Sequence, residues 1–179
     1  IDFLNKVGAF YVNIVRNTPL TLIIVFCNIG FIVNLGMSFT ENIARNNIIW
    51  AIIGLSFYHA AFVCEALRSG VNTVPVGQAE AARSIGLTFS QSLSEVLLPQ
   101  AFRGAITPLG NTLIALTKNT TVATAIGVAE ISGLMKEMME FRADLIIVIF
   151  LLVAIGFVIL TLPIGLLTTR LSTKLAVKR

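Results

Sequence analysis

Four long apolar segments constrain the fold of this chain more than any other feature. They cover about residues 19–37, 48–67, 99–116 and 145–167. A helix that crosses a bilayer needs about 20 predominantly apolar residues, and each segment approaches or meets that length. The chain of 179 residues is 56% hydrophobic and only 12% charged, about half the charge of a typical soluble domain. We therefore predict an all-α, polytopic membrane protein with about four spans in a single domain, residues 1–179.

Composition also excludes several classes of function. The net charge of +4 is not gathered into a basic stripe with interleaved aromatic residues, so we expect no nucleic-acid binding. Cys27 and Cys64 fall inside apolar segments, where thiols behave as small hydrophobes, so we expect neither a disulfide nor a metal site. No Gly-x-x-x-x-Gly-Lys-Ser/Thr loop is present, and we predict that the chain is not itself an ATP-binding enzyme.

A polar segment at residues 77–101 interrupts the apolar sequence. Pro75 and Gly77 precede a short Ala-rich stretch that Gly86 ends, which predicts a helix over residues 78–85, with Gly77 as its N-terminal boundary. Two helical turns are unstable alone in water, so a neighbour must hold them. Thr88 and Gln91 form a capping-box pattern for the next helix, and Pro99 predicts a kink in it.

This segment resembles the EAA loop of the membrane subunits of ATP-binding-cassette (ABC) importers. The resemblance is carried by Gly77-Gln-Ala-Glu80-Ala81-Ala82, by Gly86 and by the sequence Leu98-Pro99-Gln100-Ala101. It implies that the 78–85 helix is a cytoplasmic coupling helix that docks in a groove of an ATPase subunit. The residues expected to make this contact are Gly77, Glu80, Ala81, Ala82 and Gly86. The alternative is an ordinary amphipathic connector between two membrane helices.

Other segments are similar to the permeases of polar amino-acid importers. These are Arg16-Asn-Thr-Pro-Leu20, the Glu-x-x-Arg-x-Gly pattern of Glu65-Ala-Leu-Arg68-Ser-Gly70, Pro108-Leu-Gly-Asn111, and Leu116-Thr-Lys118-Asn119-Thr120-Thr121. The resemblance implies the type I ABC importer fold and is strongest to actinobacterial glutamate permeases, which assemble from two different membrane subunits, two ATPases and a lipid-anchored binding protein. Such permeases carry a further membrane helix before the Arg-x-Thr-Pro-Leu segment, and we expect the natural protein to have it ahead of Ile1.

Orientation follows from the Lys and Arg residues in the loops. With a cytoplasmic N-terminal segment, nine basic residues lie inside and four outside: Lys6, Arg16, Arg68, Arg83, Arg103, Arg170, Lys174, Lys178 and Arg179 against Arg45, Lys118, Lys136 and Arg142. This places the coupling helix and the C-terminus in the cytoplasm of a multi-pass protein of the cell membrane. Outside, residues 120–141 are intermittently apolar and predict a short half-membrane helix followed by a surface helix.

Several polar residues near the spans are candidates for the substrate pathway. Glu65 is the only acid within a span, where a charge costs about 2.5–3.5 kcal/mol. It could bind an α-amino group or form a structural ion pair with Arg68. The third span, interrupted by Pro108 and Gly110, breaks near a group of polar residues that could bind an anion or act as caps. The pathway candidates are Glu65, Asn111, Lys118, Asn119, Thr120 and Thr121. His59 is expected to be packed and hydrogen-bonded.

The sequence therefore predicts a permease subunit of an ATP-driven amino-acid importer, with glutamate as the expected substrate. The expected partners are ABC ATPase subunits that bind ATP and Mg²⁺, a second permease subunit, an extracytoplasmic substrate-binding protein and membrane lipid; no cofactor or metal is expected in this chain. A gradient-driven secondary transporter is the alternative, although such proteins are expected to show inverted repeats and several intramembrane carboxylates. A passive membrane anchor would not explain Glu65.

Overall fold

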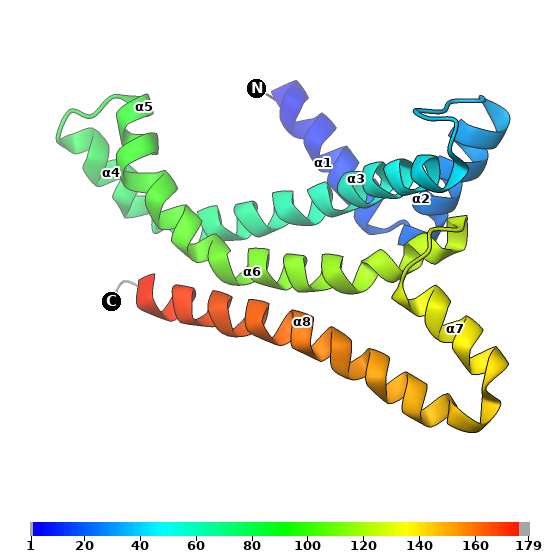
Figure 1. The fold of residues 1–179 in the computed structure, drawn as a ribbon. Helices are drawn as coiled ribbons and strands as arrows, with labels where there is room; N and C mark the ends of the chain where they lie inside the picture. The colour runs from blue at the N-terminus through cyan, green and yellow to red at the C-terminus, as the bar shows by residue number, and fades with distance from the viewer. Residues whose placement is uncertain (1, 176–179) are drawn as a thin grey trace. The chain divides into compact units, whose positions relative to one another are not determined.

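The computed structural model describes residues 2–175, and all regular structure in that range is helical (Figure 1). Short 3₁₀ and π-helical segments, labelled η, connect or extend the α-helices. In chain order the elements are α1 (Asp2–Arg16), α2 (Leu20–Phe26), η1 (Cys27–Asn34), α3 (Ile43–Asn72), α4 (Val76–Ser84), α5 (Phe89–Gln91), η2 (Ser92–Leu97), α6 (Leu98–Asn119), η3 (Thr120–Ile126), α7 (Ile131–Phe141), η4 (Ala143–Leu145) and α8 (Ile146–Leu175).

The described residues divide into two compact units. The first contains residues 2–61 and 115–162, and the second contains residues 62–114 and 163–175. Helices α3, α6 and α8 each contribute residues to both units. The two units are described separately below.

The core of the first unit forms where α2, α3 and η3 pack together. Its buried residues come from all three elements: Leu20, Ile24, Ala51, Leu55, Ala123 and Ile126. Gly54 allows the close approach of α2, because a Cβ at this position would lie 2.8 Å from the Ile24 side chain. The side-chain amide of Asn47 donates to the carbonyl of Ile126 over 2.8 Å, and this bond ties α3 to the end of η3.

The helices agree in part with the four predicted spans. By length and composition, Ile43–Asn72 and Ala143–Leu175 are long and apolar enough to cross a membrane, and the bent pair Asp2–Arg16 with Leu20–Asn34 would supply a third span. Pro19 is the residue immediately before α2, as expected from its place at the start of the first segment. That helix, continued by η1, ends at Asn34 and thus before residue 37.

The third predicted span is helix α6, and the prediction that Pro108 and Gly110 interrupt it was wrong. The α-helix runs without a break through Leu98–Asn119. Proline removes one backbone donor, and in membranes neighbouring helices and Ser/Thr side chains compensate for such helix-breaking residues. At 22 residues, α6 has the length to cross a bilayer, but it does not meet the combined criterion of length and apolar composition that Ile43–Asn72 and Ala143–Leu175 meet.

In the second unit, α3 and α6 cross at very small residues. A Cβ added to Gly70 would lie 2.3 Å from the Ala101 carbonyl oxygen and 2.7 Å from the Ala105 Cβ. A Cβ at Gly104 would lie 2.3 Å from the Thr73 hydroxyl oxygen. Small residues at such a crossing let two membrane helices approach closely. This packing gives a physical reason for Gly70 in the Glu-x-x-Arg-x-Gly pattern.

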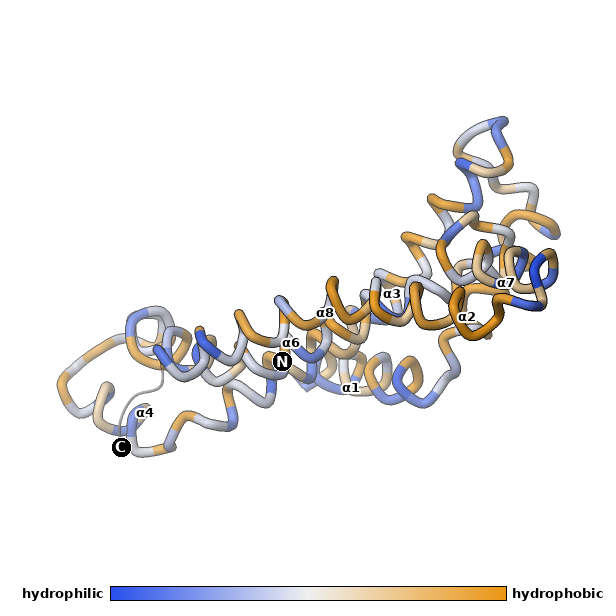
Figure 2. The backbone as a smooth tube through the Cα atoms, turned by 60° about the horizontal axis from the view of Figure 1, so that its bottom comes forward, coloured by the Kyte–Doolittle hydropathy of each residue, from blue (hydrophilic) through white to orange (hydrophobic). Residues whose placement is uncertain are grey.

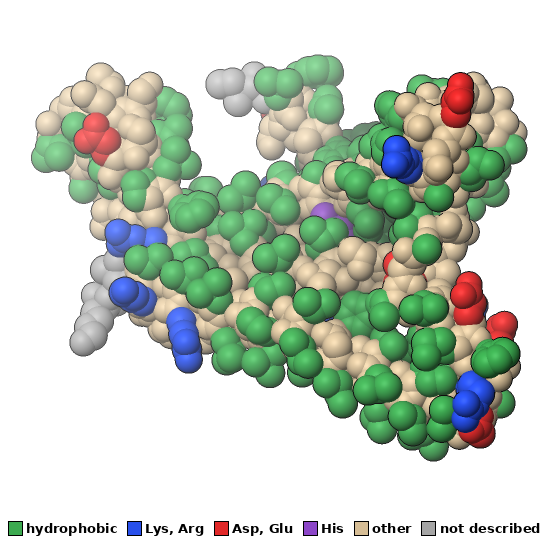
Figure 3. Space-filling model, in the orientation of Figure 1, with side chains coloured by type: hydrophobic (Ala, Val, Ile, Leu, Met, Phe, Trp, Pro, Cys, Tyr) green, Lys and Arg blue, Asp and Glu red, His purple; other side chains and the backbone are tan. Residues whose placement is uncertain are grey.

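Helix α8 presents apolar side chains on nearly every face. Ile149 is its one buried residue among those described, and hydrophobic residues follow the helix along its length (Figure 2). Hydrophobic side chains also cover much of the visible surface (Figure 3). A helix that is apolar all round and exposed belongs in lipid or against other membrane helices. The last turns of α8 carry Arg170 and Lys174, which is consistent with an end at the membrane surface.

Candidate functional site

Helix α4 is the short helix that the polar segment predicted. It covers Val76–Ser84, and its N-cap is Pro75, whose extended backbone starts the helix. The N-terminal boundary predicted at Gly77 was wrong by two residues, because the N-cap is Pro75 and Gly77 lies inside the first turn. A Cβ at Gly77 would meet no atom within 4 Å, so no steric contact within this chain requires a glycine there.

Helix α4 ends at Ser84, and Gly86 closes the turn that follows it, as predicted. Gly86 has φ +85°, a left-handed conformation that favours glycine. Its N–H donates to the Arg83 carbonyl over 3.0 Å, and the N–H of Leu87 donates to the Ala82 carbonyl over 3.2 Å. This pair of bonds is a Schellman motif. It satisfies the last carbonyls of α4 and turns the chain toward α5.

One face of α4 packs against the protein and the other is open. Ala82 is buried, and α4 packs on η2, where the Gln100 side chain from α6 also reaches Gln78 over 3.4 Å. Glu80 and Ala81 lie on the exposed side. Ala82, one of the expected contact residues, therefore serves the packing of α4 on its own chain.

Apolar side chains flank the open face of α4, which sequence reasoning missed. Val76, Ile85 and Phe89 are 76%, 78% and 70% exposed. Each lies beside the Ala-rich stretch, so the open surface combines small, charged and large apolar groups. Exposed large apolar side chains grouped in this way are typical of a surface that another protein or a membrane covers. The signal in the sequence was an apolar residue at each edge of the polar segment.

The helix after Gly86 begins with the predicted capping box. The Thr88 hydroxyl accepts the Gln91 N–H over 3.4 Å, while the Gln91 side-chain oxygen accepts the Thr88 N–H over 3.0 Å. The backbone then forms the π-helical segment η2 and returns to α-helix at Leu98, one residue before Pro99. The helix is thus irregular next to the predicted kink. The Ser92 hydroxyl in η2 is buried without a hydrogen bond within the described structure.

The second candidate region lies where α6 passes into η3. The Asn119 amide nitrogen lies 3.3 Å from Nε2 of His59, which is buried, and His59 Nδ1 lies 3.1 Å from the Leu55 carbonyl oxygen. Because a carbonyl only accepts, Nδ1 carries the proton and Nε2 accepts from Asn119. His59 is therefore packed and hydrogen-bonded, as predicted. The pair fixes the C-terminal end of α6 against α3.

The polar side chains beside Asn119 bond locally. The hydroxyl of Thr120 donates to the Thr117 carbonyl and that of Thr121 to the Lys118 carbonyl, both over 2.8 Å. These bonds match the capping alternative for the two threonines. Lys118 is exposed. The structure thus brings Lys118, Asn119, Thr120 and Thr121 together at one helix end.

Glu65 and Asn111 lie elsewhere, in the second unit. Glu65 accepts from Arg68 over 3.2 Å, one turn away on α3, which is the ion pair considered as the structural alternative. Asn111 is exposed on α6. The role of these residues in substrate passage stays a prediction.

Glu130 is a site residue that the sequence did not single out. Its carboxylate caps α7 by accepting the N–H groups of Ser132 and Gly133 over 2.9 and 2.8 Å. It also accepts the hydroxyls of Ser132 and Thr124, so it joins α7 to η3. Burial raises the pKa of the Glu130 carboxyl, but the hydrogen bonds from Ser132, Thr124 and Gly133 outweigh that effect and hold the pKa below its ordinary value.

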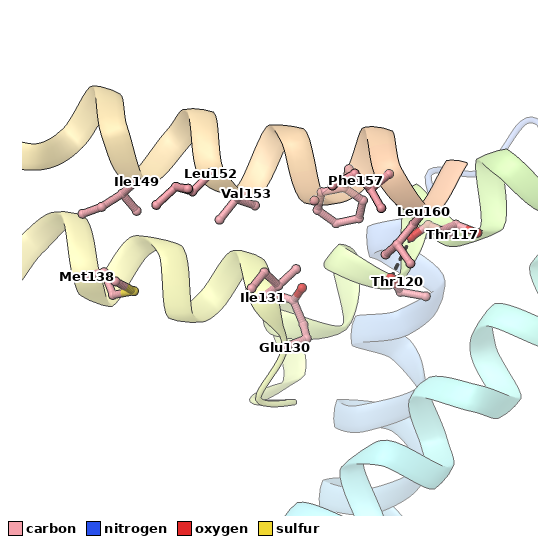
Figure 4. A pocket seen from close by; sticks show the side chains of 12 residues that line it. Thr117, Thr120, Glu130, Ile131, Met138, Ile149, Leu152, Val153, Phe157 and Leu160 are labelled. Atoms are coloured by element: carbon pink, nitrogen blue, oxygen red, sulfur yellow. Dashed lines mark hydrogen bonds between the residues drawn. The ribbon is translucent and has the colours of Figure 1, made fainter. Parts of the chain in front are cut away.

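A cavity of about 670 Å³ lies between α7 and α8 in the first unit (Figure 4). Its α8 wall is apolar and includes Leu152, Phe157 and Leu160. Thr120 and Glu130 lie on the opposite wall. The carboxylate of Glu130 is already occupied by four donors, so it is a structural cap in this arrangement.

Similarity to a known protein family identifies the group to which this chain belongs. The family described as binding-protein-dependent transport system inner membrane component matches residues 2–177. The chain belongs to this family. It is therefore a membrane permease component of an ABC transport system, and such components work with an ATPase and a substrate-binding protein. The gradient-driven alternative receives no support.

Relatives in this family carry amino-acid transport names. The glutamate transport system permease protein GluC of Corynebacterium efficiens is 52% identical over 184 residues, which cover 100% of this chain and 81% of the relative. GluC of Corynebacterium glutamicum is 50% identical with the same coverage. The probable glutamine ABC transporter permease protein GlnM of Bacillus subtilis is 33% identical over 91% of this chain and 72% of its own length.

Two solved structures share the fold. A crystal structure of an amino acid ABC transporter with histidines superposes with a TM-score of 0.83, covering 97% of this chain and 78% of that one. An inward-facing MetNI methionine ABC transporter gives a TM-score of 0.75, covering 98% of this chain and 76% of that one. Both are 24% identical to this chain. They confirm the predicted all-α permease fold of type I importers.

Proposed function

We propose that this permease imports glutamate. The observation that carries the proposal is the 52% identity to a glutamate permease over the whole of this chain. Relatives named for other amino acids are less similar, for example 33% for an arginine permease and 36% for an L-cystine permease, both from Bacillus subtilis. Glutamate is therefore the substrate that similarity favours.

We infer that the open face of α4 is the docking surface for the ATPase, which binds ATP and Mg²⁺. Glu80 and Ala81 would lie at the centre of this surface, with Val76, Ile85 and Phe89 at its edges. The Schellman turn at Gly86 sets the direction in which the chain leaves α4. Gly77 offers a surface without a side chain. A buried Ala82 and an exposed Glu80 fit a helix that packs on the permease through one face and is contacted by the ATPase through the other.

Movement of α4 would reach the membrane through the helices on either side of it. Helix α3 leads into α4, and α6 follows it by way of η2. These two helices cross at Gly70 and Gly104, where backbone meets backbone with little room for independent sliding. ATPase closure would thus move the α3 and α6 ends together, and alternating access would follow from that motion.

The substrate pathway is proposed to pass the end of α6, where Lys118, Asn119, Thr120 and Thr121 meet. Glu65 and Asn111 are its further candidates. The binding protein would deliver glutamate to the outer face formed by residues 38–47 and 119–142. The C-terminus would be cytoplasmic. A second, different permease subunit would complete the pathway, because so few spans do not enclose a polar channel alone.

Uptake by the reconstituted complex tests the substrate and the energy source. The permease, co-purified with its partners, is placed in proteoliposomes, and its subunits are identified by mass spectrometry. We expect labelled glutamate uptake that requires internal ATP, persists when ion gradients are dissipated, and is reduced more by unlabelled glutamate than by glutamine, arginine or cystine. Preference for another amino acid would refute the assignment of glutamate as the substrate. A single kind of permease subunit would refute the heteromeric assembly.

Charge reversal tests the coupling surface. Glu80→Lys places a long cation in the proposed interface, where an unpaired charge costs several kcal/mol. We expect it to lower ATPase association and uptake while leaving the amount of folded permease unchanged. Glu140→Lys is the matched control for ATPase association, since Glu140 is exposed on α7, far along the chain from α4 and within the proposed outer face. Normal ATPase binding and uptake by Glu80→Lys would contradict the assignment of α4.

A further inference from the structure

Helix α1 carries an apolar stripe that nothing in the described structure covers. Phe3, Val7, Phe10 and Ile14 recur every three or four residues and therefore share one face. Their exposed fractions are 75%, 49%, 68% and 49%, so the stripe is open along the whole helix. Four large apolar groups on one helix face form a continuous surface that water does not favour.

The remaining faces of α1 show how the helix is oriented. Val12 and Val15 are buried against Ala61 of α3, and the Tyr11 hydroxyl donates to the Phe57 carbonyl over 2.6 Å. The polar face carries Asp2, Lys6 and Asn13; the first two form an exposed ion pair with a distance of 3.3 Å. The open stripe lies between the packed apolar face and the polar face, so Lys6 and Asn13 border it, and Asn5 lies opposite. Helix α1 is thus amphipathic, with half of its apolar arc unoccupied.

The bend after α1 sets the direction of the helix. Helices Asp2–Arg16 and Leu20–Asn34 meet at 100°. The turn between them leaves few carbonyls without partners, because the Asn17 amide donates to the Asn13 carbonyl over 2.7 Å and the Thr18 hydroxyl to the Ile14 carbonyl over 2.8 Å. Counted as a single span, the pair would be broken at this bend. If the predicted span at residues 19–37 is instead the segment that crosses the membrane, α1 lies at 100° to it and close to the membrane plane.

We propose that α1 lies in the membrane interface, with Phe3, Val7, Phe10 and Ile14 inserted among lipid acyl chains. Interfacial helices bury an apolar face in the acyl boundary and keep a charged face in the headgroup region, as the two faces of α1 would do. The inference requires a membrane location but no particular substrate.

Side-chain size favours lipid over a second protein helix as the occupant. Close helix pairs in membranes use small residues, and this chain uses Gly70, Ala101 and Ala105 where α3 crosses α6. The stripe on α1 contains only large side chains. Such side chains pack well against flexible acyl chains and hold a rigid helix at a distance.

Spin labels on two faces of α1 test the proposal in the complete complex, reconstituted in liposomes. In a background with Cys27→Ala and Cys64→Ala, a label is attached at Phe10→Cys or, as the matched control, at Asn5→Cys, an exposed position on the side of α1 opposite the stripe. Oxygen partitions into the bilayer, and a nickel chelate stays in water. We expect the label at position 10 to collide with oxygen several times more often, relative to nickel, than the label at position 5.

Two results would overturn the proposal. A label at position 10 that neither reagent reaches means that a protein covers the stripe. Preferential collision with nickel there means that α1 lies in water. Val7→Cys repeats the measurement on the same face if Phe10→Cys reduces assembly, so the outcome does not depend on one variant.

Discussion

Gly70→Ala tests whether α3 and α6 approach as closely as the structure indicates. The new Cβ would lie 2.3 Å from the Ala101 carbonyl oxygen, 2.7 Å from the Ala105 Cβ and 2.8 Å from the Ala105 nitrogen. Real Cβ atoms essentially never come within 3.0 Å of such atoms, so the helices must separate. The obstructing atoms belong mainly to the backbone, and rotation of a side chain offers no relief.

The magnitude follows from two opposing effects. Overpacking a tight contact costs about 1–3 kcal/mol. Replacing a helical glycine by alanine gains up to about 1 kcal/mol, because glycine is the more flexible in the unfolded chain. We expect a net loss of about 1–2 kcal/mol for Gly70→Ala. Uptake per complex should fall as well, if the crossing transmits the movement of α4.

The assay is the thermal unfolding midpoint of the purified complex, followed by uptake in proteoliposomes. Gly8→Ala is the control, because Gly8 is helical and a Cβ there meets no atom within 4 Å. The control should be neutral or stabilised by up to about 1 kcal/mol. If Gly70→Ala is as stable and active as Gly8→Ala, the close crossing and the transmission argued from it are both wrong.

Three further predictions concern other positions. Gly86→Val should destabilise the turn after α4 by about 1–2 kcal/mol, because φ is +85° at this position. It should also reduce ATPase association, measured by co-purification. Gly77→Ala should keep the fold of α4. Glu130→Gln should lower the thermal unfolding midpoint near neutral pH, because it removes the ionised cap of α7. Since the folded-state pKa of Glu130 is depressed, the difference in midpoint from the unaltered protein should shrink as the pH falls through that pKa. A difference that does not change with pH would contradict the ionised cap. Glu65→Gln should lower uptake more than the amount of complex in the membrane, while equal losses would favour the ion pair with Arg68 as its whole role.

Local rules made much of the helical structure predictable. Long apolar runs correspond to α3 and α8, and the polar segment to α4. The C-terminal end of α4 and the start of α5 were predictable because Gly86 and the Thr88–Gln91 box act through bonds between residues a few positions apart. The roles of Glu80 in ATPase docking and of Lys118 in substrate passage stay predictions, since they depend on partners.

Tertiary packing determined what spacing along the chain did not indicate. Pro108 signals a helix break locally, yet α6 continues through it as an unbroken α-helix, which membrane helices tolerate where tertiary neighbours satisfy the freed backbone group. His59 and Asn119 are 60 residues apart in sequence, and only the packing of α3 against the end of α6 brings them together. The need for glycine at position 70 was likewise not predictable from nearby residues, because it arises from the close approach of the α6 backbone. Caps and apolar periods are properties of neighbouring residues, whereas helix crossings depend on how whole faces fit, and that fit is fixed only in three dimensions.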